Sequence, residues 1–252
     1  MIKKDITLSV DDITLSGSFY IPDSSGIYRS VCFCHGIPSG LPPEPGDGGY
    51  PALAERICRA GFAVLCFNFR GCRTSGGNFD ILGWTNDVSA ALDFLWTQPE
   101  VDRSRIALLG FSAGAAVAIC VGARDTNVAA VASCACPAEW TFFGLEPEKL
   151  IEYFRKTGII RDQNFPESHE EWLDNFKIVD PLYYVSAISP RPLLLVHGDK
   201  DDLVNVKDVH KLFNKAGEPK KLEIIEGAGH HLRRDERAVQ STIEWLQQNL
   251  SK

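Results

Sequence analysis

The residues Gly110 to Gly114, GFSAG, have the spacing G-x-S-x-G around Ser112. They follow the apolar run RIALLG, which predicts a buried strand, and they open the run AGAAVAICVGA, which predicts a helix. In this strand–turn–helix setting the glycines permit a tight turn that lifts the serine side chain above the sheet. Free N–H groups at the helix start favour negative charge beside the hydroxyl. Ser112 is therefore the candidate nucleophile.

A serine hydroxyl needs a general base to take its proton and a carboxylate to orient that base. Both residue types follow downstream, in the order Ser, Asp, His. The segment PLLLVHGDKDDLV carries Asp199, Asp201 and Asp202 just past one predicted strand, and LEIIEGAGHHL carries His230 and His231 past the next. In a parallel sheet these strand ends lie on the same edge, where the ligand sites of α/β proteins form. The pattern predicts nucleophilic catalysis from three neighbouring loops.

The elements that must hold these loops alternate from residue 30 onward. The predicted strands are SVCFCHG, FAVLCFNF, RIALLGF, VAAVASCAC, RPLLLVHGD and KKLEIIEGAG, with helical patterns between and after them. This alternation predicts an α/β fold with a mostly parallel sheet and helices on both faces. Before it, ITLSVDDITLSGSFYIP predicts two strands joined by a turn at Asp11 and Asp12.

Residues 137–190 interrupt the alternation. They are rich in aromatic side chains and carry helical patterns near residues 147–157 and 168–177. We predict a core formed by residues 1–136 and 191–252, with residues 137–190 as a cap inserted between two strands. The aromatic residues directly after the preceding strand end have two interpretations: they pack in the cap's own core, or they line an acyl or aromatic pocket above Ser112. These candidate substrate-binding residues are Trp140, Phe142 and Phe143.

The composition narrows the function classes. The chain has 252 residues and a net charge of -7, and it has no extended run of Lys or Arg. An acidic surface disfavours nucleic-acid binding, and the pair Arg233-Arg234 is predicted to be a solvated helix start. No signal-like segment is visible, and the longest apolar stretch, residues 115–123, is too short to span a bilayer. We expect a cytoplasmic protein that binds neither nucleic acid nor membranes.

The eight cysteines lack the C-x-x-C spacing of zinc sites. We predict that they are reduced thiols in the core. Two C-x-C pairs, Cys32 with Cys34 and Cys134 with Cys136, lie in predicted strands. Because alternate strand residues share a face, we expect each pair to pack on one side of the sheet.

The segments HGIPSG, FNFRGCRTSGGNF, LLGFSAGAAVA, VHGDKDDLV and GAGHH together resemble the α/β-hydrolase family. The resemblance covers the chain from residue 30. It is nearest to the esterase and serine-aminopeptidase-like (S33-type) branch, which includes small cinnamoyl and feruloyl esterases. It implies the α/β-hydrolase fold, with a mostly parallel sheet of eight strands, flanking helices and a small helical cap. It also implies a reaction that uses no cofactor and no metal.

The resemblance assigns roles to individual residues. The family's catalytic acid is the Asp of G-x-x-D-x-x-V, which here is Asp201, with Asp199 and Asp202 as neighbouring alternatives. The catalytic base follows G-A-G and is His230, with His231 as the alternative.

His35-Gly36 resembles the oxyanion loop of the family. The resemblance implies that the backbone N–H groups of Ile37 and Ala113 hold the oxygen of a tetrahedral intermediate. We expect His35 and His197 to be structural. His169 and His210 are predicted on helix surfaces.

The loop FRGCRTSGG departs from the family pattern, since Asn68 and Arg73 replace the common Asp and Gly. We expect Arg70 to brace this loop through hydrogen bonds. A role for Arg70 or Arg73 in binding a substrate carboxylate is the alternative.

These observations favour a serine hydrolase that cleaves small-molecule carboxylic esters through an acyl-enzyme intermediate. A peptidase or an acyl-thioesterase with the same triad is the alternative, because fold analogy does not separate these reactions. A third hypothesis is a hydrolase-like binding protein without catalysis. The sequence leaves open a homodimer.

Overall fold

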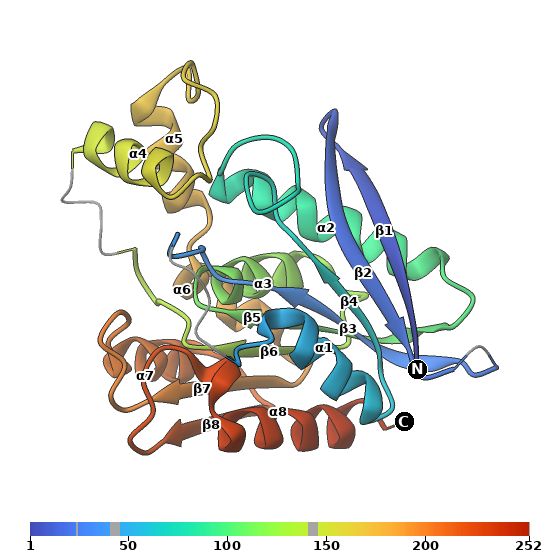
Figure 1. Cartoon of the computed structure of the whole chain (residues 1–252). Helices are drawn as coiled ribbons and strands as arrows, with labels where there is room; N and C mark the ends of the chain where they lie inside the picture. Colours follow the sequence, from blue (N-terminus) through green and yellow to red (C-terminus); the bar gives the residue numbers. More distant parts are fainter. Residues whose placement is uncertain (24, 41–45, 141–145, 252) are drawn as a thin grey trace.

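The structure is a computed structural model that describes residues 1–23, 25–40, 46–140 and 146–251. In these ranges, eight strands form one sheet in the order β1-β2-β4-β3-β5-β6-β7-β8 (Figure 1). Strands β3 to β8 run parallel, and β1 and β2 add an antiparallel edge. The mostly parallel sheet is as predicted. The strands are β1 (Ile2–Val10), β2 (Ile13–Ile21), β3 (Tyr28–Cys34), β4 (Ala63–Phe67), β5 (Val101–Phe111), β6 (Ala130–Cys134), β7 (Leu193–Gly198) and β8 (Lys220–Ile225).

Helices cover both faces of the sheet, which also agrees with the prediction (Figure 1). The apolar sides of α1 and α8 pack on one face, and those of α2, α3 and α7 pack on the other. Side-chain oxygens of Asp80, Asn205 and Asp235 accept N–H groups from the first turns of α2, α7 and α8, so these helices begin at capping residues. The helices are α1 (Gly49–Arg59), α2 (Ile81–Thr97), α3 (Ala113–Arg124), α7 (Val206–Lys215) and α8 (Glu236–Asn249).

The turn between β1 and β2 is tied to the rest of the fold by a buried arginine. Asp11 and Asp12 both have positive φ angles, 48° and 59°, as a tight hairpin turn of this hand requires. The Arg70 guanidinium donates to Asp11 at 2.8 Å and to Asp87 of α2 at 2.6 and 2.9 Å. The Asp87 side chain is fully buried. Arg70 therefore braces its loop, as predicted, and its Nε and Nη2 donors are engaged within the protein.

The two C-x-C pairs behave differently. Cys32 and Cys34 pack into the same apolar cluster, beside α2 and α3, as predicted. Cys134 packs on the α1 and α8 side, whereas Cys136 packs on the opposite side. The prediction is wrong for this second pair because Ala135 has a φ angle of 52°, which ends the strand's alternation.

The segment after β6 contains the two predicted helices, observed as α4 (Pro147–Lys156) and α5 (His169–Ile178), followed by α6 (Pro181–Tyr184) and a 3-10 turn at Val185–Ile188. Figure 1 shows α4 and α5 together at one end of the molecule, near the start of α2. Phe154, Trp172 and Phe176 pack against Phe79, which lies just before α2. The Trp172 indole also donates to the Phe79 carbonyl oxygen at 3.0 Å. The two helices therefore share an aromatic core with the loop before α2.

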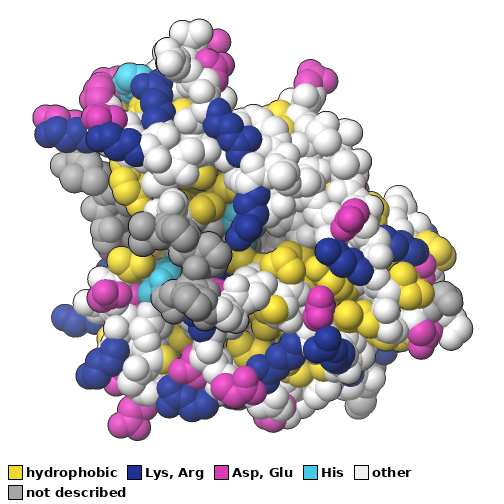
Figure 2. Space-filling view, in the orientation of Figure 1, with side chains coloured by type: hydrophobic (Ala, Val, Ile, Leu, Met, Phe, Trp, Pro, Cys, Tyr) yellow, Lys and Arg dark blue, Asp and Glu magenta, His cyan; other side chains and the backbone are white. Residues whose placement is uncertain are grey.

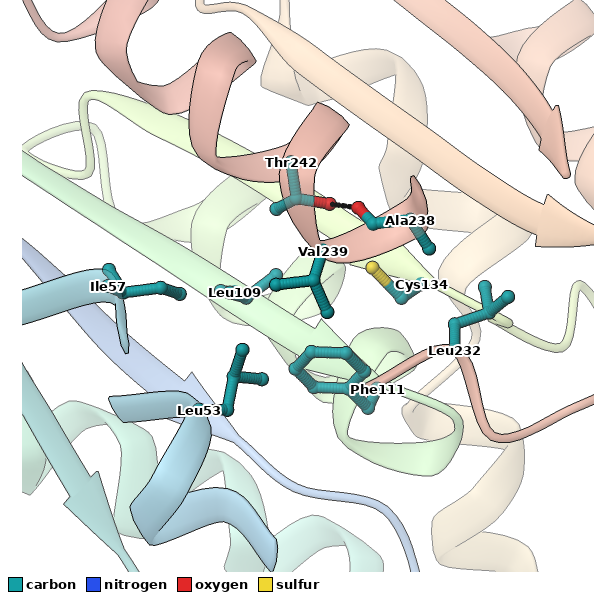
Figure 3. Close-up of a pocket in the computed structure, with 9 residues that line it drawn as sticks. All are labelled: Leu53, Ile57, Leu109, Phe111, Cys134, Leu232, Ala238, Val239 and Thr242. Atoms are coloured by element: carbon teal, nitrogen blue, oxygen red, sulfur yellow. Dashed lines mark hydrogen bonds between the residues drawn. The ribbon is translucent and has the colours of Figure 1, made fainter. Parts of the chain in front are cut away.

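An apolar pocket lies between α1, β5 and α8 (Figure 3). Its volume of about 10 Å³ is room for one water molecule and not for a ligand. The hydrogen bond drawn in it, from Thr242 Oγ1 to the Ala238 carbonyl oxygen, lies within α8. This pocket is a packing gap of the core.

On the face drawn in Figure 2, Lys and Arg side chains are interspersed with Asp and Glu. No helix within the described ranges has the length and the apolar composition needed to cross a membrane.

Replacing Arg70 by Met tests the buried ion pair. The substitution leaves the buried Asp87 carboxylate without its cation, which costs about 3–5 kcal/mol. At about 2–4 °C per kcal/mol, the melting temperature should fall by at least 6 °C. Thermal unfolding followed by circular dichroism measures this change.

Arg105 is the matched control, because its ion pair with Asp102 is accessible to solvent: the two side chains are 28% and 25% exposed. Arg105→Met should cost less than about 1 kcal/mol. Equal losses in the two variants would contradict this account of Arg70.

Candidate active site

Ser112 is the single residue that connects the end of β5 to the start of α3. Its φ angle of 54° is rare for a residue with a side chain, and such a conformation costs about 1–3 kcal/mol. The surrounding backbone holds it: the Ser112 N–H donates to the Cys134 carbonyl oxygen at 2.9 Å, and the Ser112 carbonyl oxygen accepts from Ala115 and Ala116. The side chain is therefore fixed above the carboxyl edge of the sheet.

Neither Gly110 nor Gly114 has room for a side chain. A Cβ atom on Gly110 would lie 2.4 Å from Ala115 Cα. A Cβ atom on Gly114 would lie 2.2 Å from the carbonyl oxygens of Cys34 and His35. Since real contacts of this kind are not that short, only glycine allows α3 to approach the ends of β5 and β3 so closely.

His230 lies between the other two candidate residues. Its Nε2 atom is 2.9 Å from Ser112 Oγ, and its Nδ1 atom is 2.8 Å from Asp201 Oδ2. The His230 side chain is 10% exposed, and the Asp201 side chain is fully buried. The structure thus brings together three residues that are far apart in the sequence.

The Asp201 carboxylate is held by both of its oxygens. Oδ1 accepts the backbone N–H groups of Leu203 and Val204 at 2.9 and 2.8 Å. Burial acts to raise the pKa of Asp201, but the hydrogen bonds from His230 and from the backbone outweigh it, so the pKa is lowered. Asp201 is therefore an anion at neutral pH, suited to orient His230.

The alternative residues take other positions. Asp199 accepts the Gly227 N–H at 2.6 Å and so binds the loop that leads to His230. Asp202 is exposed. His231 lies beside His230, with the ring centroids 5.7 Å apart.

The loop after β3 passes directly against Ser112. A Cβ atom on Gly36 would lie 3.0 Å from Ser112 Cβ and 3.6 Å from Ser112 Oγ, so Gly36, which precedes Ile37, borders the hydroxyl. Within the described residues, neither the Ile37 N–H nor the Ala113 N–H has an acceptor. Two backbone donors are thus available beside Ser112.

His35 has a structural role, as expected. The Phe69 N–H donates to its Nε2 atom at 3.1 Å, and its Nδ1 atom lies 2.7 Å from the Gly36 carbonyl oxygen. Because Nε2 accepts, the proton is on Nδ1 and donates to Gly36. Burial lowers the pKa of His35 to about 4, so the ring is neutral and fixes the loop beside Ser112.

Of the three aromatic candidates, Trp140 is described and Phe142 and Phe143 lie outside the described residues. Trp140 is 6% exposed, and its indole N–H donates to the Val179 carbonyl oxygen at 2.7 Å. Its ring packs edge-on against Phe176 of α5, at 5.2 Å between centroids. Trp140 thus packs with the residues of the inserted segment.

An ionic link that was not predicted from the sequence joins the two loops that border Ser112. The guanidinium of Arg233 pairs with both carboxylate oxygens of Asp47 at 2.5 Å, and Arg234 Nε lies 2.9 Å from the same carboxylate. Arg233 also lies over the ring of Tyr50, whose hydroxyl accepts the Gly36 N–H at 3.3 Å. The prediction of a solvated pair is wrong for Arg233, whose side chain is 17% exposed. The only sequence signal for this link is Asp47, an acidic residue in the glycine-rich loop GDGG.

An open groove with a volume of about 530 Å³ borders His230. It is within the size range of small-molecule sites, although its lining is half polar. It is lined by Asp202, Leu203, Gly227, Ala228, Gly229, His230, His231, Arg234 and Asp235.

The sheet order, the helices on both faces and the turn at Ser112 define an α/β-hydrolase fold. The sequence model of the prolyl oligopeptidase family, of the Peptidase_S9 type, matches residues 52–252. The chain belongs to this family. The nearer resemblance to the serine-aminopeptidase-like branch and to cinnamoyl esterases stays a prediction.

Individual proteins of known sequence or structure are also similar to this chain. The chain is 27% identical over 232 residues to the uncharacterized protein Rv2307c of Mycobacterium tuberculosis, covering 90% of this chain and 72% of that protein. Among solved structures, the α/β-hydrolase GrgF from Penicillium sp. sh18 superposes with a TM-score of 0.78 at 21% identity, covering both chains fully. The esterase Pf2001 of Pyrococcus furiosus gives a TM-score of 0.69 at 24% identity, covering 98% and 92%. At these identities the solved structures establish a shared fold.

Asp47→Asn tests the link between the loops. The substitution removes charged hydrogen bonds worth about 2 kcal/mol, so the melting temperature at pH 7 should fall by roughly 4–8 °C. The arginine side chains lower the pKa of Asp47, so its stabilising effect is present above the unfolded-state value of about 3.9 and is lost as the pH falls through the folded-state value. The difference between wild type and variant should therefore shrink from pH 7 to pH 3.

Glu146→Gln, which breaks an exposed ion pair with Lys149, serves as the control and should leave the melting temperature unchanged. A difference for Asp47→Asn that stays constant with pH would rule out an ionic link.

Proposed function

We propose that this protein is a serine hydrolase that cleaves carboxylic esters through a Ser112–His230–Asp201 triad. The observation that carries the proposal is the position of His230, which has one ring nitrogen 2.9 Å from Ser112 Oγ and the other 2.8 Å from Asp201 Oδ2. These are the two contacts that a general base needs to activate a serine and to hold the correct tautomer.

The reaction proceeds in two halves. Ser112 Oγ attacks the ester carbonyl carbon while His230 Nε2 takes its proton, and His230 then gives this proton to the departing alcohol. Asp201, which is buried and anionic, stabilises the imidazolium that forms between these steps. Water then attacks the acyl-enzyme while His230 takes its proton, and His230 gives this proton to Ser112 Oγ as the acid is released.

Charge on the carbonyl oxygen requires donors that are already in place. The N–H groups of Ile37 and Ala113 fit this role, since Ile37 follows Gly36, which contacts Ser112, and Ala113 follows Ser112 itself. Neither N–H group has an acceptor among the described residues. Ala113 also begins α3, where the helix dipole favours a negative charge. Because the donors are backbone groups, the isoleucine side chain at position 37 does not matter to the role.

A small-molecule ester suits the surroundings of the triad. The groove beside His230 has room for one substituent of such an ester. Residues 137–190 act as a cap in this proposal, with the aromatic core around Phe154 and Trp172 attaching it to the loop before α2. The known structures of similar fold include an esterase, Pf2001.

Membership of the prolyl oligopeptidase family supports a second candidate, a peptidase with the same triad. Peptide and ester cleavage share the acyl-enzyme chemistry and differ in the leaving group that His230 must protonate. A thioesterase shares the first half-reaction in the same way.

Ser112→Ala should reduce the hydrolysis of short p-nitrophenyl esters by about 10⁴-fold or more, because the nucleophile is lost. Initial rates of purified wild type and variant measure this change. His210→Ala, on the exposed side of α7, is the control and should retain full activity. Substantial turnover by Ser112→Ala would overturn the proposal.

Esters, thioesters and aminoacyl amides of one acyl group separate the candidate reactions. We expect kcat/KM to be higher for the ester than for the amide by at least about tenfold, since an alcohol leaves more readily than an amine. A higher kcat/KM for the amide would establish the peptidase instead. A folded protein that reacts with none of these, and whose Ser112 resists a fluorophosphonate probe, would be a binding protein.

A further inference from the structure

His197 is a buried polar residue to which the triad assigns no role. It is the fifth residue of β7, and its side chain is fully buried. It lies four residues before Asp201, at the strand end that carries the proposed catalytic acid.

The hydrogen bond of His197 fixes its tautomer. Nε2 lies 2.9 Å from the Val204 carbonyl oxygen, which can only accept. The proton is therefore on Nε2, and the same nitrogen lies 3.4 Å from Asp201 Oδ2. The Val204 N–H donates in turn to Asp201 Oδ1. His197 thus binds Val204, whose own N–H binds Asp201 Oδ1, and it also lies close to Asp201 Oδ2.

The other nitrogen of His197, Nδ1, is buried and has no hydrogen-bond partner among the described residues. An unsatisfied buried acceptor costs stability, whereas an apolar side chain of similar shape would not. The polar ring therefore does not serve the packing of β7. The ring instead acts through its N–H group, which binds the Val204 carbonyl oxygen and lies near Asp201.

The charged and titratable groups that act on His197 are Asp201, His230 and Asp208. Burial is the strongest influence and lowers the pKa of His197, so the ring is neutral. A neutral N–H stabilises the Asp201 carboxylate without competing with the imidazolium of His230 for its charge.

We propose that His197 is a positioning residue that holds Asp201 with Oδ2 facing His230 Nδ1, by directing its Nε2–H between Asp201 and the Val204 carbonyl oxygen. It touches no substrate and acts only through Asp201 and His230. The inference rests on the proposed triad and extends it to a fourth side chain.

His197→Phe keeps a planar ring and removes the donor, and His197→Gln restores an N–H near the position of Nε2. We expect kcat for p-nitrophenyl esters to fall about 10- to 100-fold in the Phe variant, as for other small errors in catalytic alignment, with KM unchanged. The Gln variant should recover most of the loss. The acidic limb of the kcat/KM profile should move to higher pH in the Phe variant, because a carboxylate that has lost a donor holds the protonated imidazole more strongly.

Leu195→Ala is the matched control. Leu195 is buried on the same strand and face, and it makes no contact with Asp201 among the described interactions. We expect this variant to lower the melting temperature while leaving the pH profile in place. An equal kcat loss and an unshifted profile in both variants would reduce His197 to a packing residue.

Proton NMR gives a readout that does not depend on turnover. The His230 Nδ1–H, bonded to Asp201, should give a low-field resonance that is absent in His230→Ala. We expect this resonance to shift or broaden in His197→Phe and to return in His197→Gln. An unchanged resonance in His197→Phe would overturn the proposal for His197. If the resonance changes in His197→Phe but the wild-type protein cleaves no ester, the proposed function alone would be overturned.

Discussion

The arrangement of the site depends on the pair of hydrogen bonds made by His230, to Ser112 on one side and to Asp201 on the other. Each bond joins a different strand end, because Ser112 follows β5, Asp201 follows β7 and His230 follows β8. The three ends meet at one edge because these strands are parallel. The sheet therefore supplies the geometry, and the strained backbone at Ser112 supplies the last adjustment of the hydroxyl.

Around this pair of hydrogen bonds, ionic and polar contacts connect the loops. Asp47 and Arg233 connect the loop before α1 to the loop that carries His230. His35 fixes the backbone beside Ser112, and His197 fixes the turn that contains Asp201. Because polar contacts depend on direction, they hold atoms within the small tolerance that proton transfer requires.

Much of the fold and of the candidate site could be predicted from the sequence, since both depend on local patterns. Apolar runs and helical patterns predicted the strands and helices, and the parallel strand ends placed Asp201 and His230 at the edge that carries Ser112. What could not be predicted depends on backbone angles or on distant partners. The positive φ of Ala135 sends Cys136 to the opposite face, and the partner of Arg233 lies 186 residues away at Asp47. The hydrogen bond from His197 Nε2 to Val204 likewise depends on how the turn at residues 201–204 folds back toward β7.

The central claim is that Ser112 carries the acyl group between the two halves of the reaction, and it can be tested by trapping that intermediate. The protein is mixed with a p-nitrophenyl ester, quenched in acid within the first turnover and digested, and the peptides are analysed by mass spectrometry. We expect the mass of the acyl group to be added to the peptide containing Ser112, and to Ser112 itself on fragmentation. An acyl group found on another residue, or burst release of p-nitrophenol without any acylated peptide, would contradict it.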